Sequence, residues 1–494
     1  MQSATSAVLL AGTWAEEEKK VADAEKSKKG GSETAALHDN TMTPRDGRRE
    51  RGQIMHEAIP HRSHAAWKPD SDRPDPVDVI IKSHEGRLAE LAALRYGRML
   101  ISPFTFYRGT AGVMAYDLAS TPNSKVRVQT CGDAHVMNFG AFATPERNIV
   151  FDLNDFDETL PAPWEWDVKR LAVSFVLAAR DNALKEKHAR NAAVAVAKAY
   201  RKKTYEYSKM SILDIWYDRI DWGVVQESTS DKELKKRRKA QTEKALKRTI
   251  ASFYFPKMTE SASGKHILKD NPPTIYHWTG PGGDKFRDQA AKSLTMYRET
   301  LQEDRRRLFD RYRLEDIAIK VVGIGSVGTV CAVALMLAPD DEPMFLQFKQ
   351  ANNSVLEAFA GRSEFENHGQ RVVAGQRIIQ SASDIFLGWT QFDDGKHFYI
   401  RQLRDGKVKL EPALWDGPRM EEAAELMGAA LARAHARSGD SAVLSGYLGE
   451  EDTFDEAIGD FSMSYADQAQ SDYERFAAAA KKGRIPVAED LGLD

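Results

Sequence analysis

The chain has little cysteine and no long hydrophobic run. Cys131 and Cys331 are the two cysteines among 494 residues, too few for a disulfide framework or a cysteine metal cluster. A reducing, cytoplasmic compartment is therefore expected. The apolar stretch Ala7 to Ala11 is too short to span a bilayer, and no basic region precedes it, which argues against a signal peptide. We expect no association with a membrane.

An excess of either charge is also lacking. The 70 basic residues nearly balance the 73 acidic ones, so the composition lacks the excess of positive charge that is typical of proteins that bind nucleic acid. With 42% apolar and 29% charged residues, the composition is ordinary for a globular protein. The length suggests two or three structural units. Nothing in the composition indicates an oligomeric state.

Few large apolar groups occur in the first sixty or so residues, so residues 1–60 are predicted to be a disordered tail, with order beginning near Pro74. The middle of the chain is predicted to be mostly helical after three short strands. The predicted helices cover residues 78–100, 166–180 and 189–208, the predicted strands cover 126–130, 139–143 and 149–153, and the charged stretch 231–248 is predicted as a solvated helix face.

A β-rich pattern returns after residue 316. Strands are predicted at 317–322, 329–337 and 344–348, followed by a helix at 354–381, strands at 385–391 and 397–403, and a helix at 421–437. The turn at 339–343 favours antiparallel pairing of the second and third strands.

A glycine-rich motif separates the first two of these strands. Gly323, Gly325 and Gly328 fit the spacing G-x-G-x-x-G, with Ser326 inside it. Such glycines let backbone amides approach phosphate oxygens without obstruction. A dinucleotide fold needs a helix after the last glycine, whereas a kinase glycine-rich loop joins two antiparallel strands. The predicted strand after Gly328 favours the kinase arrangement.

Lys349 ends the next strand, where a kinase-type third strand presents a lysine to the α- and β-phosphates. The alternative is a tight hairpin with a solvated charge at its end. Glu357, Glu364 and Glu366 lie on the predicted helix that follows, as candidate ion-pair partners of Lys349. The sequence does not choose among them.

Two acidic motifs complete the predicted site. Asp133 precedes Asn138 by five residues in a loop, the spacing at which a kinase aspartate meets the acceptor hydroxyl while the asparagine reaches magnesium. Asp155 follows the strand at 149–153 and is the predicted metal ligand, with Asp152 and Asp157 as alternatives. The acidic run lacks the glycine and glutamate of a calcium-binding EF-hand loop, and a plain turn remains the other explanation.

Other charged or polar residues near these motifs have a structural explanation as well as a functional one. His135 has no second histidine at ligand spacing, so packing within the loop is expected rather than metal binding. Arg95, Arg98 and Arg108 are candidates to clamp an anionic substrate, but ion pairs within the fold are at least as well supported.

Two resemblances follow from these residues. The loop from Gly132 and Asp133 to Asn138, followed by an Asp-Phe strand end, resembles aminoglycoside phosphotransferases and choline kinases of the protein-kinase-like superfamily. The motifs RYGRM at 95–99, SPF at 102–104, CGDAH at 131–135, NDFDE at 154–158 and AHARSGD at 434–440 resemble a bacterial family of unknown function numbered 2252. This second likeness extends from about residue 45 to the C-terminus.

The order of the parts differs from that of ordinary kinases, because the glycine-rich motif and lysine follow the catalytic loop. The resemblance therefore implies an α+β, bilobal, protein-kinase-like fold in circularly permuted order. The helix at 427–435 would have led directly into the Gly-Asp loop. The implied units are a helical C-lobe-like region at 75–312, a β-rich N-lobe-like region at 313–405, and a helical region at 406–494 that completes the C-lobe.

The likeness also implies roles for individual residues. Gly323, Gly325 and Gly328 would cover the phosphates, Lys349 would orient them, and Asp133 would position the nucleophile. Asn138 and Asp155 would hold magnesium. Backbone groups from Arg401 to Leu403 would contact adenine, and Asp167 would brace the catalytic loop.

The predicted activity is ATP- and Mg²⁺-dependent phosphoryl transfer to an acceptor, a small molecule or a protein, that the sequence does not identify. Transfer of AMP from a reversed nucleotide is an alternative on the same scaffold. A nucleotide-binding pseudokinase is a second alternative. A third is an NAD-dependent oxidoreductase, which would need a helix after Gly328 and would leave the acidic motifs unused.

Overall fold

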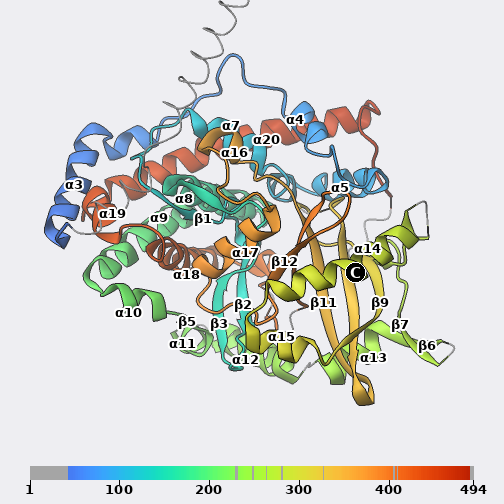
Figure 1. Ribbon diagram of the computed structural model, residues 1–494. Helices are drawn as coiled ribbons and strands as arrows, with labels where there is room; N and C mark the ends of the chain where they lie inside the picture. The colour runs from blue at the N-terminus through green and yellow to red at the C-terminus, as the bar shows by residue number, and fades with distance from the viewer. Residues whose placement is uncertain are drawn as a thin grey trace, which may run out of the picture.

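Figure 1 shows a computed structural model of the chain, which describes residues 43–489 apart from 229–231, 248–249, 263, 280–281, 326, 404–405 and 409. Helices gather on one side of the molecule and an antiparallel sheet lies on the other (Figure 1). The fold is mixed α and β, as the sequence predicts. No helix in the described part of the chain combines the length and hydropathy that crossing a bilayer requires.

The α-helices described before residue 313 are α3 (Arg45–Ala58), α4 (Pro76–Lys82), α5 (Ala92–Met99), α6 (Pro103–Tyr107), α7 (Ala111–Ala119), α8 (Trp164–Asp181), α9 (Glu186–Lys209), α10 (Ile212–Tyr217), α11 (Trp222–Ser228), α12 (Lys232–Lys247), α13 (Phe255–Met258), α14 (Gly283–Glu299) and α15 (Glu303–Phe309). The later helices are α16 (Glu357–Ala360), α17 (His368–Ile379), α18 (Gly417–Ala436), α19 (Ser441–Leu448) and α20 (Thr453–Lys481).

The main sheet has six antiparallel strands in the order β12-β13-β11-β10-β9-β8. Their bounds are β8 (Ile275–Tyr276), β9 (Arg313–Lys320), β10 (Cys331–Ala338), β11 (Glu342–Ala351), β12 (Gly388–Gln391) and β13 (His397–Gln402). Every residue of β10 is buried, because both faces of the sheet are covered. Ala332, Ala334 and Met336 share a hydrophobic cluster with α14, while Val333, Leu335 and Leu337 share another with Ile250 and Leu268.

Small sheets position the loops of the helical side. β1 (Arg127–Thr130) pairs with β4 (Leu160–Pro163), and β2 (Phe139–Ala143) pairs with β3 (Ile149–Leu153), which also pairs with β5 (Ile220–Asp221). β6 (Thr259–Ala262) and β7 (Lys265–Leu268) form a separate hairpin. The bounds of β2 and β3 are those predicted from the sequence.

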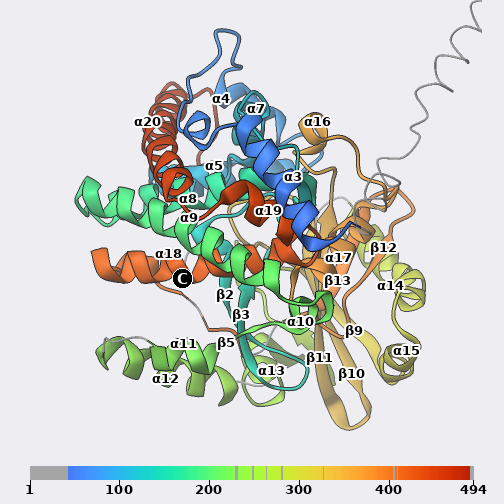
Figure 2. The ribbon, with the colours of Figure 1, turned by 90° about the vertical axis from the view of Figure 1, so that its left-hand side faces the viewer.

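Helices α8, α9, α18 and α20 pack together as the core of the helical side. Figure 2 shows α9 and α18 running alongside each other. A Cβ added at Gly428 of α18 would lie 2.3 Å from the carbonyl oxygen of Val196 in α9, so glycine permits this close approach. Sixteen of the 18 residues of α8 are buried, as expected for a helix enclosed by others.

The predicted beginning of order near Pro74 is wrong. Residues 1–42 lie outside the described residues, but α3 spans Arg45–Ala58 and packs against α19. The contact is close: a Cβ at Gly52 would lie 2.1 Å from the oxygen of Val443, and one at Gly446 would lie 2.0 Å from the oxygen of Arg49. This helix is polar in composition and is stabilised by backbone-to-backbone packing, which a scan for large apolar groups does not detect.

Two predicted helices are interrupted. The helix predicted at 78–100 consists of α4 and α5, separated by a turn that contains Gly86 with a φ of 78°. The helix predicted at 354–381 consists of the single turn α16 and of α17, separated by a loop that begins with Gly361, whose φ is 93°. Positive φ is incompatible with a continued right-handed helix and is readily adopted by glycine.

The sheet unit begins earlier than residue 313. β8 pairs with β9, and α14 covers one face of the sheet, so residues from about Ile250 onward belong with the strands rather than with the helical region before them. The predicted boundary at 312/313 was placed at the first long β-rich run, and it separates the sheet from the segments that bury it.

The end of α18 meets β1, although about 300 residues separate them along the chain. The backbone N–H of Gln129 donates to Ser438 Oγ at 2.8 Å, and Gly439 packs against Val128. We call two ranges the terminal segments: residues 43–126, which precede the junction residues in the sequence, and residues 440–489, which follow them. Gln129 and Ser438 are therefore neighbours in space, while α20 of the terminal segments packs into the core of the helical side.

Candidate functional site

A cavity of about 520 Å³ lies between the helical side and the sheet. Asp133, Asn138, Asp155, Asp157 and Gly325 are among the residues that line it. These residues come from three separate segments of the chain. The structure therefore brings five of the twelve predicted site residues to one cavity.

Lys349 reaches this site from β11. Its Nζ lies 2.9 Å from Asp157 Oδ2 and 3.5 Å from Asp155 Oδ1, and the side chain is almost fully buried. Burial alone would lower the pKa of Lys349, but the charges of Asp155 and Asp157 raise it well above its usual range. The Tyr399 hydroxyl donates to Asp157 Oδ1 at 2.8 Å. Lys349 is thus a buried, permanently charged group beside two carboxylates.

The partners of Lys349 are aspartates rather than the predicted glutamates. Glu357 accepts hydrogen bonds from Asn353 and Ser354, while Glu364 and Glu366 are exposed. Helix α17 instead presents Arg371, which donates to the carbonyl oxygens of Asp157 and Thr159. Because α17 begins only at His368, the three glutamates lie before it.

Asp155 and Asp157 follow the β2–β3 hairpin. Burial, reinforced by the negative charge of Asp157, raises the pKa of Asp155. The side chain of Asp152 points away from this pair: Arg433 Nη2 donates to Asp152 Oδ1 at 2.6 Å, and the N–H and Oγ of Ser381 each donate to Oδ2 at 2.9 Å. Asp152 and Arg433 are both fully buried, so Asp152 has a structural role and Asp155 and Asp157 are the carboxylates at the cavity.

The Asp133 loop is held from beneath by α8. Asp167 accepts hydrogen bonds from the backbone N–H of Cys131 at 2.7 Å and of Gly132 at 3.0 Å. Asn138 Nδ2 donates to the carbonyl oxygen of Asp133 at 2.7 Å, which closes the loop. The resemblance assigned Asp167 this bracing role, and the contacts agree with it. His435 of α18 completes the support, with Nε2 3.2 Å from Asp167 Oδ2.

The carboxylate of Asp133 has a cationic partner that the sequence analysis did not single out. Arg170 Nη2 lies 2.5 Å from Asp133 Oδ1, and Nε donates to the same oxygen at 2.7 Å. Arg170 lies three residues after Asp167 on α8, and i, i+3 positions share a helix face. That spacing is a signal that could have identified it. His135 is buried against the same loop, 3.7 Å from Asp133, as the expectation of a packing role requires.

The glycine-rich segment joins β9 to β10 across the cavity edge. Gly323 and Gly328 have positive φ values of 48° and 91°. A Cβ at Gly325 would lie 4.0 Å from Asp133 Oδ2, so the segment passes over the Asp133 loop. Ser326 lies outside the described residues. The element after Gly328 is a strand, so the helix that a dinucleotide motif needs is replaced here by β10.

The predicted adenine-contacting residues lie at the end of β13. Arg401 Nε donates to Gln347 Oε1, and Nη1 to the carbonyl oxygen of Asn154. The backbone N–H of Leu403 donates to the carbonyl oxygen of Phe345 at 2.8 Å, so this amide already has a partner. Arg401 is electrostatically coupled to Asp155, which helps to keep the pKa of Arg401 high.

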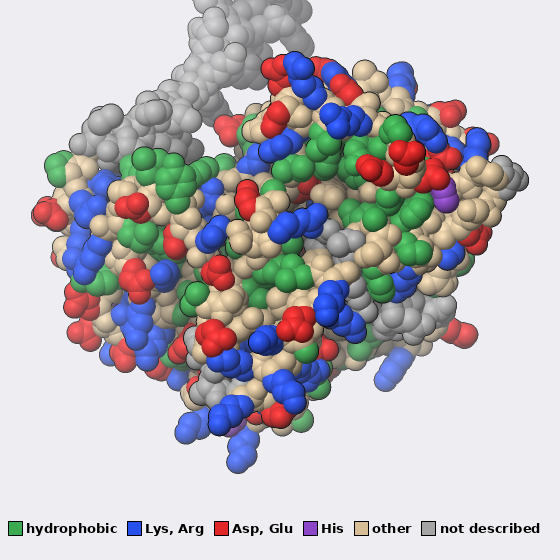
Figure 3. All heavy atoms as spheres, turned by 90° about the horizontal axis from the view of Figure 1, so that it is seen from below, with side chains coloured by type: hydrophobic (Ala, Val, Ile, Leu, Met, Phe, Trp, Pro, Cys, Tyr) green, Lys and Arg blue, Asp and Glu red, His purple; other side chains and the backbone are tan. Residues whose placement is uncertain are grey.

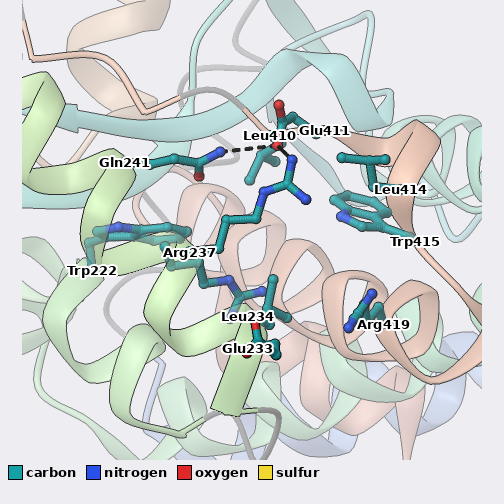
Figure 4. A pocket seen from close by; sticks show the side chains of 11 residues that line it. Trp222, Glu233, Leu234, Arg237, Gln241, Leu410, Glu411, Leu414, Trp415 and Arg419 are labelled. Atoms are coloured by element: carbon teal, nitrogen blue, oxygen red, sulfur yellow. Dashed lines mark hydrogen bonds and ion pairs between the residues drawn. The ribbon is translucent and has the colours of Figure 1, made fainter.

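A second cavity, of about 150 Å³, lies under α12 (Figure 4). Its charged residues neutralise one another: Arg237 pairs with Glu411 at 2.6 Å, and Gln241 donates to the same carboxylate at 3.0 Å. Arg238 pairs with Glu422 at 2.8 Å. This small cavity has none of the predicted site residues. Figure 3 shows basic and acidic side chains interspersed over the face viewed from below.

Comparison with known proteins identifies a family but no characterised relative. No curated protein and no solved structure matches the chain. One family model, described as "uncharacterized protein conserved in bacteria (DUF2252)", matches residues 87–479. The match contains Asp133, Asp155, the glycine-rich segment and Lys349, and covers well over half of the chain. The chain therefore belongs to this bacterial DUF2252 family.

Proposed function

We propose that this protein is a kinase-like phosphotransferase that uses ATP and Mg²⁺, with its two lobes in circularly permuted order. The observation that carries the proposal is the convergence of Asp133 and Asn138, Asp155 and Asp157, and Lys349 on one cavity beneath a glycine-rich segment. These groups have the chemistry that phosphoryl transfer requires: cations and metal ligands for the phosphates, and a carboxylate for the acceptor hydroxyl.

The junction of α18 with β1 supports the permuted order. In the cyclic reading, α18 leads directly into the Asp133 loop, and the hydrogen bond between Gln129 and Ser438 joins these two points. The sheet order agrees with that reading as well, because β9, β10 and β11 are neighbours and the strand that carries Lys349 follows the two strands around the glycine-rich segment.

The donor set fits magnesium. Carboxylate and amide oxygens are hard ligands, and Mg²⁺ is usually held by one or two carboxylates together with waters and substrate phosphates. Asp155 and Asn138 would hold the ion, with Asp157 beside them. Magnesium binding of this kind does not need three protein ligands, and among the described residues no three His, Cys, Asp or Glu side chains form such a group. When bound, Mg²⁺ would neutralise charge on the phosphate oxygens.

The protein's own residues would perform the remaining tasks. Asp133 would orient the acceptor hydroxyl and accept its proton, while Arg170 and Asp167 keep the loop in place. Lys349 would exchange its contacts with Asp155 and Asp157 for phosphate oxygens. The strand after Gly328, in place of the helix that a dinucleotide motif needs, supports this proposal over the NAD-dependent alternative.

The test is calorimetric titration of the full chain with ATP and MgCl₂. Lys349→Met and Asp155→Asn are expected to weaken binding by roughly 10- to 150-fold, the equivalent of losing hydrogen bonds to charged groups worth about 1.5–3 kcal/mol. Lys292→Met, which removes an exposed lysine paired with Asp393, is the matched control and should bind as the unchanged protein does.

The position of the label in the product separates the two transfer reactions. Label from γ-labelled ATP on the acceptor would support phosphoryl transfer, whereas label from α-labelled ATP would support transfer of AMP. Binding of ATP without transfer to any acceptor tested would favour a pseudokinase. Magnesium-independent binding of NAD, or no nucleotide binding at all, would contradict the proposal.

A further inference from the structure

Three arginines from one of the terminal segments line the large cavity together with the carboxylates: Arg87, Arg95 and Arg108. Arg95 is only 2% exposed, yet its hydrogen bonds are long contacts to the carbonyl oxygens of Ile80 (3.4 Å) and Gly109 (3.5 Å). The Nε atoms of Arg95 and Arg108 are buried without a hydrogen-bond partner. These guanidinium groups are therefore incompletely satisfied within the fold.

Arg87 differs in that it holds the glycine-rich segment. Its Nη1 donates to the carbonyl oxygens of Gly325 at 2.7 Å and Val327 at 2.8 Å, and its Nε to that of Ser83 at 2.9 Å. Over the part of the chain that the structure describes, none of the three arginines forms an ion pair with a carboxylate. Three like charges thus share one cavity with only backbone oxygens as direct partners.

Arg73 shows how carboxylates neutralise a buried arginine in this protein. Arg73 forms bidentate contacts with both Asp117 and Asp472, at distances of 2.7 to 2.9 Å. At the cavity the opposite holds: burial, with a further contribution from the charge of Arg87, lowers the pKa of Arg95 to about 9, and burial also lowers the pKa of Arg87 and of Arg108. An unpaired buried charge destabilises a folded protein, so this arrangement points to a ligand that supplies the missing charge.

The nearby carboxylates do not supply it. Asp133 and Asp155 are close enough to Arg108 to influence its pKa, and Glu158 and Asp157 are close enough to influence that of Arg87. However, Asp133 is already paired with Arg170, Asp155 and Asp157 are close to Lys349, and Glu158 accepts a hydrogen bond from the backbone N–H of Val355. The carboxylates at the cavity thus have other partners, whereas Arg95 and Arg108 each keep a buried Nε without one.

We propose that Arg87, Arg95 and Arg108 form a subsite for a phosphate group, next to Asp133. Guanidinium groups bind tetrahedral oxyanions through paired N–H donors, and three of them suit a dianion better than a single carboxylate. The phosphate has two sources, a phosphorylated acceptor or the polyphosphate of the nucleotide itself. Only the assignment to an acceptor rests on the proposed function; anion binding does not.

The experiment measures thermal unfolding and calorimetric binding of the full chain with inorganic phosphate and pyrophosphate. Phosphate is expected to raise the Tm of the unchanged protein. Arg95→Met and Arg108→Met should weaken phosphate binding by about tenfold or more, since each removes charged hydrogen-bond donors. Arg313→Met, which removes an exposed arginine paired with Glu315, is the matched control and should leave phosphate binding unchanged.

A second measurement keeps the test informative if phosphate binds weakly. Without added anion, Arg95→Met should have a Tm at least equal to that of the unchanged protein, because it removes an unpaired charge. Arg73→Met should lower the Tm, because it leaves two buried carboxylates unpaired. A strongly lowered Tm for Arg95→Met would indicate a structural arginine and contradict the proposal.

Titrations with nucleotide separate the two sources. Lys349→Met should weaken nucleotide binding and keep phosphate binding, so that failure of the proposed function and failure of this subsite are distinguishable. Phosphate that binds in the presence of saturating MgATP would identify the subsite with the acceptor. Phosphate that competes with MgATP would assign it to the nucleotide's own phosphates. No effect of phosphate on the unchanged protein, or an equal effect on the arginine variants, would overturn the subsite.

Discussion

At the scale of single residues, the chemistry of this protein depends on which buried polar groups have partners. Asp152 and Asp155 lie three residues apart in a run of alternating apolar and acidic residues, yet Asp152 is neutralised by Arg433 and Asp155 faces the cavity. An odd spacing of three residues places two side chains on opposite faces of an extended chain, although β3 itself ends at Leu153. It does not say which face meets an arginine, since Arg433 comes from a helix 281 residues later.

Buried histidines near the N-terminus make stability depend on pH. His64 is fully buried, with Nε2 2.6 Å from the Tyr447 hydroxyl. Burial, with a further contribution from the charge of Lys169, lowers the pKa of His64 to about 2, from 6.5. Between these values the unfolded chain binds a proton that the folded chain does not, so stability falls as the pH falls below 6.5.

Acidification from pH 7 to pH 5 is therefore expected to lower the free energy of unfolding by about 2 kcal/mol through His64 alone. Urea denaturation at the two pH values measures the change. His64→Gln keeps a side chain able to hydrogen-bond Tyr447 and should show a shallower dependence. An unchanged pH dependence in that variant would mean that His64 takes up a proton in the folded protein as readily as in the unfolded chain.

At the scale of elements, local pattern was sufficient where a segment's neighbours are close in sequence. β2 and β3 have their predicted bounds because alternating side chains and a four-residue turn specify a hairpin without help from the rest of the chain. The helix predicted at 354–381 failed at Gly361 because apolar spacing continues across the break. Helix α20, 29 residues long, lies in the region predicted to be helical, but its bounds were not predicted: buried alanines and glycine form much of its packed face, and small residues give a weak periodic signal.

The crossing of α3 and α19 offers a test of packing by glycine. An Ala at Gly446 would place its Cβ 2.0 Å from the carbonyl oxygen of Arg49, a backbone atom that cannot move without separating the helices. Gly446→Ala is expected to destabilise the protein by about 1–3 kcal/mol, although alanine is the better helix former.

The control lies in the same helix pair. A Cβ at Gly47 in α3 would meet only Cγ2 of Thr43 at 3.1 Å, and that side chain has room to rotate. Gly47→Ala should leave stability unchanged or raise it by up to about 1 kcal/mol. Chemical denaturation compares the two variants. Equal effects would mean that the two helices do not cross at their glycines.

At the scale of the whole molecule, the sequence predicted which residues meet at the cavity better than it predicted the boundaries of the structural units. Asp133, Asn138, Asp155, Asp157 and Gly325 meet at one cavity, with Lys349 in contact with two of them, because short motifs carry their own spacing. The partners of Lys349 and Asp133, and the segments that cover the sheet, depend on contacts between distant parts of the chain. Such contacts produce no periodic pattern in the sequence, so an analysis of hydrophobic periodicity does not detect them.

The covering of the sheet predicts which fragment folds. Residues 313–403 contain five strands, but without α14 and the segment from Ile250 both faces of β10 would be exposed to water. A fragment of residues 250–403 is expected to be folded, whereas residues 313–403 alone should be unfolded or aggregated. Circular dichroism and size-exclusion chromatography compare them. A folded 313–403 fragment would contradict this account.

The junction at Ser438 and Arg127 has a consequence for how such a protein diversifies. Gln129 and Ser438 are neighbours in space, and the segment 43–126 supplies Arg87, Arg95 and Arg108 to the cavity, while residues between 127 and 438 supply Asp133 and Asp155, with Lys349 beside them. Substitutions at these arginines can therefore change the basic residues of the cavity and leave the carboxylates and Lys349 in place. In evolutionary terms, the ligand preference that we propose for the arginines and the chemistry that we propose for the carboxylates would then be separable traits.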